Sequence, residues 1–384
     1  MPGADVVVVG GGIAGVSAGA FVAAGGASVV LLERESALSV HTTGRSAALY
    51  LANYGLEQTR RLTWAARAFL DAPPDGFADA PLMSQRGMVF VGSAADSVAL
   101  HELAAAGRLL DPAITELDSA EVLRLCPVLR PELVAGGVLE PGASDLDVAA
   151  LHGGFTRQLR AYGGVVVRSA EVVGLTARET GWRVMTTAGS YDCSQVIDAA
   201  GAWGDEVAGL AGVAPIGLRP LRRTVATVGL PAGVDARAWP AVKDVRDRWY
   251  FKPEGDGLLI SPADETPSAP CDARPDDLDV ALAMERVSEV TTLPLRSVRS
   301  TWAGLRTFSP DGDMVIGPDP LAPGFVWCVG QGGYGIQSAA AVGRLTADLL
   351  MGTVPTWALD VGIDLAALAP DRFERSVASP ARAG

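Results

Sequence analysis

The feature that most constrains the fold of this 384-residue chain is a stretch without charged side chains at residues 6–32. Its length would suffice for a membrane-spanning helix, which needs about 20 apolar residues in one continuous helix. The stretch is not uniform, however. Residues 6–9 are four valines, typical of a strand buried on both faces, whereas residues 13–24 favour a helix and residues 28–32 favour a strand again. We therefore predict a strand, a glycine turn, a helix and a second strand.

The glycine turn between the first strand and the helix has the spacing of a dinucleotide-binding motif. Gly10 permits a tight turn, Gly12 lets the backbone approach a pyrophosphate, and Gly15 allows the helix to pack closely on the strand. The amides that begin the helix then face the phosphates. Glu33 follows the second strand, where a carboxylate accepts hydrogen bonds from ribose hydroxyls. The expected cofactor contacts in this unit are Gly10, Gly12, Ile13, Ala14, Gly15, Glu33 and Arg34.

Composition narrows the possible classes of protein. The chain is 49% hydrophobic, unlike a disordered sequence, and its formal charge of −13 argues against a nucleic-acid-binding surface. The four cysteines and three histidines form no metal-binding motif, so we expect no metal site. The residues before the charge-free stretch hold an acid and no base, which is unlike a signal peptide. We expect a reduced, cytoplasmic protein without a transmembrane segment or a nucleic-acid partner.

Three later segments favour FAD over NAD as the dinucleotide. Residues 164–167 predict a strand that could flank an adenine, and residues 196–198 predict a strand that leads into small residues. A glycine-rich loop at residues 330–335 precedes a helix expected at residues 336–350. Amides of such a loop can stabilise negative charge on a flavin ring. The first two segments add expected cofactor contacts at Glu171, Val172, Ala200, Gly201 and Trp203.

Together these segments resemble the D-amino-acid oxidase and glycine oxidase superfamily of flavoproteins, over nearly the whole chain. Within that superfamily the chain is most similar to the bacterial FAD-dependent D-arginine dehydrogenases. Five blocks carry this similarity, and they are specific only in combination. They are residues 41–48 (HTTGRSAA), 222–223 (RR), 249–253 (WYFKP), 301–306 (TWAGLR) and 331–337 (QGGYGIQ).

The resemblance implies an α/β fold made of two domains that are discontinuous in sequence. A Rossmann-type FAD-binding domain would comprise residues 1–80, 141–213 and 300–375. An α+β substrate-binding domain with a mixed or antiparallel sheet would comprise residues 81–140 and 214–299. We expect residues 376–384 to form a flexible tail.

The resemblance also implies roles for individual residues. Arg306 and Arg223 would hold a substrate carboxylate, although Arg219 and Arg222 lie close to Arg223 in the sequence. Tyr250 would lie over the substrate and Tyr54 on a loop that closes the site. The carbonyl of Gly333 would accept from the substrate amine, with Gln337 one turn further on. A helix beginning at Ser46 would point at the cofactor. The cofactor contacts implied in these blocks are Thr43, Arg45, Ser46, Ala47, Ala48, Gly304, Arg306, Gly332, Gly333, Tyr334, Gly335, Ile336 and Gln337.

The chain departs from the D-arginine dehydrogenases where they bind the substrate side chain. Gly87 stands where those enzymes have a glutamate that pairs with the guanidinium, and no acid lies within residues 81–91. Leu49 and Leu51 replace a histidine and a threonine of the active-site loop. Because an unpaired buried charge is costly, such a pocket should reject cationic side chains. We therefore expect a neutral substrate with an apolar or bulky side chain.

The expected reaction is oxidation of a D-amino acid by hydride transfer from Cα to flavin N5. The imino acid would hydrolyse to an oxo acid and ammonia, and the electrons would pass to O2 or to a quinone or other carrier. Three alternatives remain open. They are a secondary-amine oxidase acting on sarcosine, glycine or proline-like substrates, a 2-hydroxyacid dehydrogenase, and a non-catalytic FAD subunit.

Overall fold

A computed structural model describes residues 3–374 of the chain, so the tail expected at residues 376–384 lies outside the described residues. The charge-free stretch forms β1 (Ala4–Val9), α1 (Ile13–Ala24) and β2 (Val29–Leu32), as predicted. Within the described residues, no helix is long and apolar enough to cross a membrane.

The first sheet has β1 at its centre, in parallel with β2 on one side and β12 on the other. Val6 and Val8 pack into one hydrophobic core, and Val7 and Val9 pack into another, so the strand is buried on both faces. This is the physical reason for four consecutive valines. The remaining strands of the sheet are β9 (Val165–Val167), β10 (Val172–Ala177), β11 (Trp182–Thr186), β12 (Gly189–Asp198), β19 (Val315–Pro318) and β20 (Phe325–Val329).

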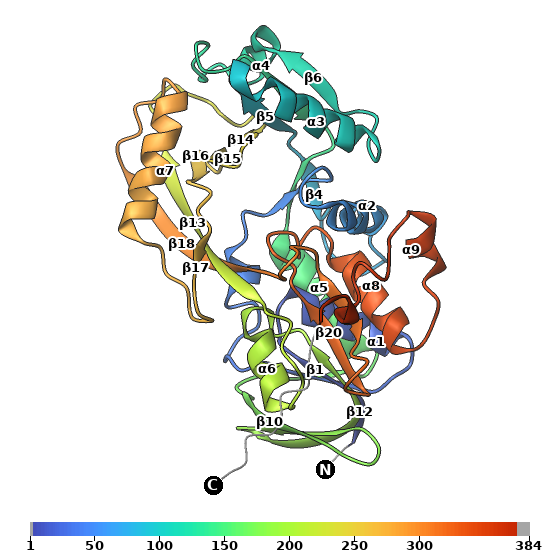
Figure 1. Cartoon of the computed structure of the whole chain (residues 1–384). Helices are drawn as coiled ribbons and strands as arrows, with labels where there is room; N and C mark the ends of the chain where they lie inside the picture. Colours follow the sequence, from blue (N-terminus) through green and yellow to red (C-terminus); the bar gives the residue numbers. More distant parts are fainter. Residues whose placement is uncertain (1–2, 375–384) are drawn as a thin grey trace.

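Helices cover the first sheet mainly on one face. There α1 packs against α5 (Val148–Ala161) and α8 (Ala339–Leu350), and α2 (Glu57–Asp71) packs against α8. The opposite core includes residues of β10, β11 and α6 (Gly204–Leu210). In Figure 1, α1, α5, α6 and α8 lie in the lower half of the molecule, with α2 above them and α9 (Thr356–Asp360) at the side.

The second sheet is mixed and contains the elements expected in the substrate domain. Its order is β17, β13, β16, β15, β14, β5, β7, β6, and β18 pairs with β13. Only the pairing of β14 with β5 is parallel. Its strands are β5 (Met88–Gly92), β6 (Thr115–Asp118), β7 (Gly136–Glu140), β13 (Arg219–Gly229), β14 (Ala241–Asp244), β15 (Tyr250–Glu254), β16 (Gly257–Ser261), β17 (Thr266–Pro267) and β18 (Val298–Phe308).

The helices α3 (Ser97–Arg108), α4 (Ser119–Leu125) and α7 (Asp277–Val290) pack on this second sheet (Figure 1). A small third sheet joins β3 (Leu49–Tyr50), β8 (Ser144–Leu146) and β4 (Met83–Gln85). The predicted fold class, a Rossmann-type α/β unit with a second mixed sheet, is therefore confirmed. The division into domains stays a prediction, but the boundary expected at residue 300 falls inside β18, which pairs with β13 along its whole length.

Two local predictions are wrong. No helix begins at Ser46, because residues 42–45 form a single 3-10 turn and Ala48 has a φ of +58°, which a right-handed helix does not allow. The Ser46 hydroxyl accepts from the Ala48 amide, a local bond that competes with helix formation. The helix expected at residues 336–350 begins at Ala339 rather than Ile336, since the glycine loop continues as turns up to that point.

Candidate cofactor and substrate site

A cavity of about 550 Å³ runs along the carboxyl ends of β1, β2 and β12 and reaches the second sheet. Most of the predicted cofactor residues line it. They are Gly10, Gly12, Ile13, Ala14, Glu33, Arg34, Thr43, Arg45, Ser46, Ala47, Glu171, Val172, Ala200, Gly201, Trp203, Gly304, Arg306, Gly332, Gly333, Gly335 and Ile336. Of the predicted substrate residues, Arg223, Tyr250, Arg306 and Gly333 line the same cavity.

The glycines of the motif are required by close approaches of the backbone. Gly10 has a φ of +110°, and a Cβ there would lie 2.5 Å from the carbonyl oxygen of Ala199. A Cβ on Gly15 would lie 1.9 Å from the carbonyl oxygen of Gly10. Gly15 does not line the cavity. Its close approach to Gly10 fits the predicted role of packing α1 closely on β1.

The loop before α1 fits a pyrophosphate. Gly12 precedes the helix and supplies no side-chain cap of its own, and no acidic residue occurs in the first turn. The Glu33 carboxylate accepts from the Gly11 amide at 2.8 Å, and the Thr43 hydroxyl accepts from the Ile13 amide at 3.0 Å. The loop is therefore held by side chains at its flanks while its centre faces the cavity, where helix-terminal amides attract an anion.

Aromatic and charged side chains meet at the end of the cavity that Glu33 lines. The Arg34 guanidinium lies 5.0 Å from the centroid of the Trp203 ring, and the His41 ring lies 4.8 Å from it. Arg34 also approaches the Glu171 carboxylate at 3.6 Å. These groups surround the position next to β2 and β9 at which the sequence predicts the adenosine half of the cofactor.

The opposite end of the cavity contains unsatisfied polar atoms. Arg223 is 4% exposed, and its Nε and Nη1 atoms have no hydrogen-bond partner within the described structure. The buried hydroxyl of Tyr250 likewise has none. The structure also distinguishes the neighbouring arginines: Arg222 pairs with Asp279, Arg219 bonds backbone carbonyls, and Arg223 alone of the three lines the cavity.

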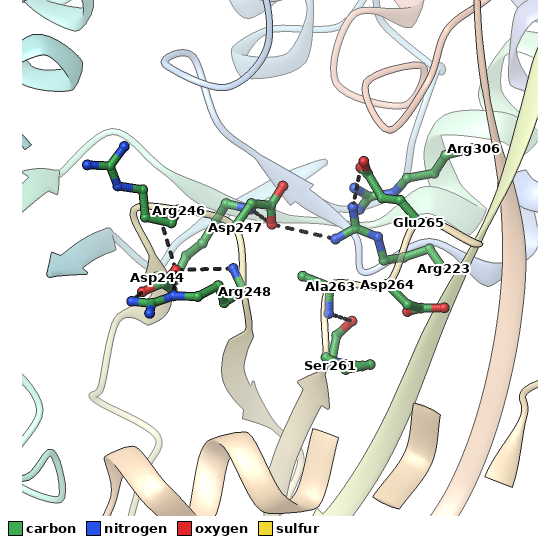
Figure 2. Close-up of polar contacts among 12 residues, drawn as sticks. Arg223, Asp244, Arg246, Asp247, Arg248, Ser261, Ala263, Asp264, Glu265 and Arg306 are labelled. Carbon is green, nitrogen blue, oxygen red and sulfur yellow. Dashed lines mark hydrogen bonds and ion pairs between the residues drawn. The ribbon is translucent and has the colours of Figure 1, made fainter. Parts of the chain in front are cut away.

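Two acids contact the terminal nitrogens of the Arg223 guanidinium, one at each (Figure 2). Glu265 accepts from its Nη2 at 2.7 Å, and Asp247 lies 3.6 Å from its Nη1. Strained backbone occurs at or just before each acid. Asp247 itself has a φ of +55°, and Ala263, two residues before Glu265, has a φ of +54°. Neither acid was predicted from the sequence.

The side chain of Asp244 fixes the first turn, since it accepts from the amides of Arg246 and Arg248 and from the Arg248 guanidinium. Ser261 fixes the second turn by accepting from the Ala263 amide and donating to the Thr224 carbonyl. Figure 2 shows both turns at the ends of their strands, with the acids directed at Arg223.

Tyr54 joins this cluster although it does not line the cavity. Arg306 donates from Nη1 to the Tyr54 hydroxyl at 3.0 Å, and Asp247 lies 3.5 Å from the same oxygen. Lys243 pairs with Asp247, and its ammonium lies 4.7 Å from the centroid of the Tyr54 ring. Burial opposes ionisation of the phenol, but the nearby cations, Lys243 and Arg306 foremost, favour it, and the net result is a pKa of Tyr54 below its ordinary value of 10.

The segment that carries Tyr54 is anchored by a buried carboxylate. Glu140, at the end of β7, accepts from the amides of Ala52 and Asn53, the two residues before Tyr54. Burial raises the pKa of Glu140 to about 7, in spite of these hydrogen bonds. Sequence reasoning missed this residue, because only the fold brings residue 140 beside residue 52.

Several predicted contacts are absent from the cavity lining. The Gln337 amide donates to the Leu51 carbonyl and to the Thr63 hydroxyl and accepts from the Leu51 amide, so it connects segments of the protein instead of facing the cavity. Ala48 and Tyr334 also lie outside the lining, and the Tyr334 ring packs edge-on against Tyr54 at 5.0 Å.

The acids near the predicted substrate residues contact Arg223 instead of lining the cavity. Residues 81–91 supply no acid to the lining, and Asp247 and Glu265 reach Arg223 from other segments, so the neutral substrate stays a prediction. Leu51 packs in a hydrophobic cluster, with Leu49 against it, and neither lines the cavity. Of the cysteines, Cys126, Cys193 and Cys328 are buried, whereas Cys271 is exposed.

The strand–glycine loop–helix unit and its cavity define a dinucleotide-binding protein of the flavoprotein type. The family model described as FAD dependent oxidoreductase (DAO) matches residues 5–349, so the chain belongs to that family. This confirms the superfamily and the FAD cofactor that the sequence predicts.

The individual relatives and solved structures considered next share a quarter or less of their residues with this chain. The chain is 24% identical to the mitochondrial dimethylglycine dehydrogenase of Mus musculus, over 96% of this chain but only 44% of that protein. It thus spans less than half the length of this curated relative. The structure is similar to that of glycine oxidase from Geobacillus kaustophilus, with a TM-score of 0.83, 20% identity, and 97% and 100% of the two chains covered. L-proline dehydrogenase from P. horikoshii has a TM-score of 0.82 at 19% identity, with 97% and 98% covered.

Proposed function

We propose that this chain catalyses the FAD-dependent oxidation of a small amino acid whose nitrogen is substituted or part of a ring. The observation that carries the proposal is the pair of unsatisfied groups at one end of the cofactor cavity: the Nε and Nη1 atoms of Arg223 and the hydroxyl of Tyr250. A buried guanidinium that keeps donors without a hydrogen-bond partner within the described structure suits a carboxylate. When bound, FAD supplies the two-electron acceptor for oxidation of the carbon–nitrogen bond.

The protein's own residues would bind and orient the substrate. Arg223 and Tyr250 hold the carboxylate, and the rigid hold of Asp247 and Glu265 on Arg223 fixes its direction. Arg306 packs against Gly333, where a Cβ would lie 2.8 Å from the guanidinium carbon, so the glycine loop and the arginine share one wall of the site. Such positioning is the main contribution a protein makes to this chemistry.

The substrate class follows from charge and from the relatives. The ion pair of Lys243 with Asp247 lies beside the site, and a bulky apolar side chain placed against it would strip water from charged groups at a cost. Relatives named for dimethylglycine, glycine and L-proline favour small or N-substituted substrates. A neutral D-amino acid is the second candidate, favoured by the five blocks shared with D-arginine dehydrogenases.

An anaerobic screen of flavin bleaching tests the proposal. Sarcosine, N,N-dimethylglycine, glycine and proline are compared with D-leucine, D-methionine and D-phenylalanine, and with 2-hydroxy acids. We expect the first group to bleach the flavin fastest. Faster bleaching by the D-amino acids would favour the second candidate, and absence of bleaching by every amine would refute the proposal. Exposure of the reduced protein to air then identifies O2 or another carrier as the acceptor.

Two adjacent arginines provide a matched comparison for the carboxylate site. Arg223→Met removes two charge-assisted hydrogen bonds, each worth about 1.5–3 kcal/mol, so kcat/KM should fall by about 100-fold or more. Arg222→Met lies on the same strand but outside the cavity, paired with Asp279, and should change kcat/KM much less. Equal losses in both variants would remove Arg223 from the proposed role.

A further inference from the structure

Only two lysines, Lys243 and Lys252, occur among the 31 basic residues of the chain, and both are buried in the second sheet. Lys252 pairs with Asp145 and Glu254, away from the cavity. Lys243 is 6% exposed and lies opposite Tyr250 in the β14–β15 register, beside the proposed carboxylate site. Because arginine provides nearly every other cation, a compact ammonium in this crowded position points to a specific electrostatic role.

The group nearest to that ammonium is the Tyr54 side chain. Lys243 faces the Tyr54 ring at 4.7 Å and the Tyr250 ring at 5.8 Å. The Tyr54 hydroxyl lies between a cation and an acid: Arg306 donates to it at 3.0 Å, and it donates to the Asp247 carboxylate at 3.5 Å. Arg306 lines the cavity and Tyr54 does not, so the phenol oxygen is one hydrogen bond away from a group that faces the proposed substrate position.

We infer that Tyr54 accepts the proton that the substrate's ammonium group must lose before oxidation, and that Lys243 and Asp247 set the acidity of its phenol. The inference rests on the proposed function. Removal of electrons from a carbon next to nitrogen draws on the nitrogen lone pair, which an ammonium lacks. A site that binds an amino acid in its usual zwitterionic form therefore needs a proton acceptor.

The proton transfer balances without a further reactant. Tyr54 first loses its phenolic proton to solvent, and the phenolate is stabilised by the donated hydrogen bond from Arg306. An N–H bond of the bound ammonium then breaks, its electron pair stays on nitrogen, and an O–H bond forms on Tyr54. Substrate and tyrosine are left neutral at these atoms, and no electron is transferred in this step.

Charges around the phenol act on its pKa in opposite directions. Burial is the largest single effect and raises the pKa of Tyr54. Lys243, Arg306 and Arg223 lower it and Asp247 raises it, with a lowered pKa as the net result. The titratable and charged groups that surround the Tyr54–Arg306 pair are Arg223 on β13, Lys243 on β14, Asp247 on the next turn, Tyr250 on β15, and Tyr334 in the glycine loop.

Lys243 and Asp247 carry opposite charges, so their replacement should shift the pH profile of kcat/KM in opposite directions. Lys243→Met removes a positive charge near the phenol and should move the rising limb of the kcat/KM profile to higher pH, by about one unit. Asp247→Asn removes a negative charge and should move it to lower pH by a similar amount. Lys243→Arg keeps the charge and should leave the limb near its wild-type position. Simple loss of the ion pair predicts shifts of the same sign in both variants.

A second measurement does not require turnover. The tyrosinate absorbance of the FAD-loaded wild-type protein is titrated against Tyr54→Phe, and the missing component gives the pKa of Tyr54. It should lie below that of an exposed tyrosine and move with Lys243→Met and Asp247→Asn as above. A Tyr54→Phe enzyme that keeps the rising limb, or same-sign shifts in both charge variants, overturns the inference and leaves the proposed function standing. Failure of every amine to bleach the flavin refutes the proposed function, and the proton-transfer role with it.

Discussion

Glu140 makes the stability of the folded protein depend on pH in an unusual direction. Its carboxyl is 1% exposed, and burial raises its pKa from 4.5 to about 7. Because the pKa of Glu140 is higher in the folded than in the unfolded protein, protonation of Glu140 favours the folded state. This stabilisation is complete below pH 4.5 and is lost as the pH rises through about 7.

The size of the effect follows from these two pKa values. Ionisation of Glu140 destabilises the folded protein by about 1 kcal/mol at pH 5 and by about 3 kcal/mol at pH 8. Glu140→Gln stays neutral at both pH values and keeps an oxygen for the Ala52 amide. The difference in the free energy of unfolding between this variant and wild type should therefore increase by about 2 kcal/mol from pH 5 to pH 8. For a chain of this length that corresponds to about 2–3 °C in Tm.

The assay is thermal unfolding of FAD-saturated wild type and variant at pH 5 and pH 8. Exposed Glu132 provides the control, since Glu132→Gln should leave the difference between the two pH values unchanged. If Glu140→Gln shows the same Tm difference from wild type at both pH values, the reasoning about its burial is refuted.

Three further predictions concern the cofactor cradle and the substrate site. Gly15→Ala places a Cβ against the Gly10 carbonyl and should strongly reduce the FAD retained on purification, whereas Gly19→Ala in the same helix meets only ordinary contacts and should retain it. Arg223→Lys keeps the charge but loses the fork, so kcat/KM should fall by about 10- to 100-fold with little change in Tm; an unchanged kcat/KM would contradict bidentate binding. Gln337→Ala should lower stability by about 2–3 kcal/mol in denaturant titrations while FAD content stays near wild type, and loss of FAD instead would restore its predicted cofactor role.

Local pattern predicted the cofactor half of the site well. The four valines, the glycine spacing and Glu33 act within one strand–helix–strand unit, where burial on two faces and close backbone approach leave few alternatives. The expected helix at Ser46 failed for an equally local reason, because a side-chain hydroxyl bonded the backbone that the helix needed.

The substrate half depends on contacts between distant segments, which spacing does not reveal. Asp247 and Glu265 become partners of Arg223 only because turns after two different strands direct them there. Gln337 falls in a block shared with the resembled enzymes, yet its side chain points to Leu51. The scarcity of lysine was visible in the sequence and was the one available signal for Lys243.

The long ladder between β13 and β18 has a mechanical consequence. It runs from Arg219 opposite Phe308 to Val228 opposite Val298, and β18 then meets the glycine loop through the Thr307–Gly332 bridge. A hinge between the two sheets would have to bend or break this ladder, which also carries Arg223 and Arg306. Substrate entry by rotation of the sheets would thus disturb the groups proposed to bind it. The ladder therefore ties the two sheets and the two arginines into one frame.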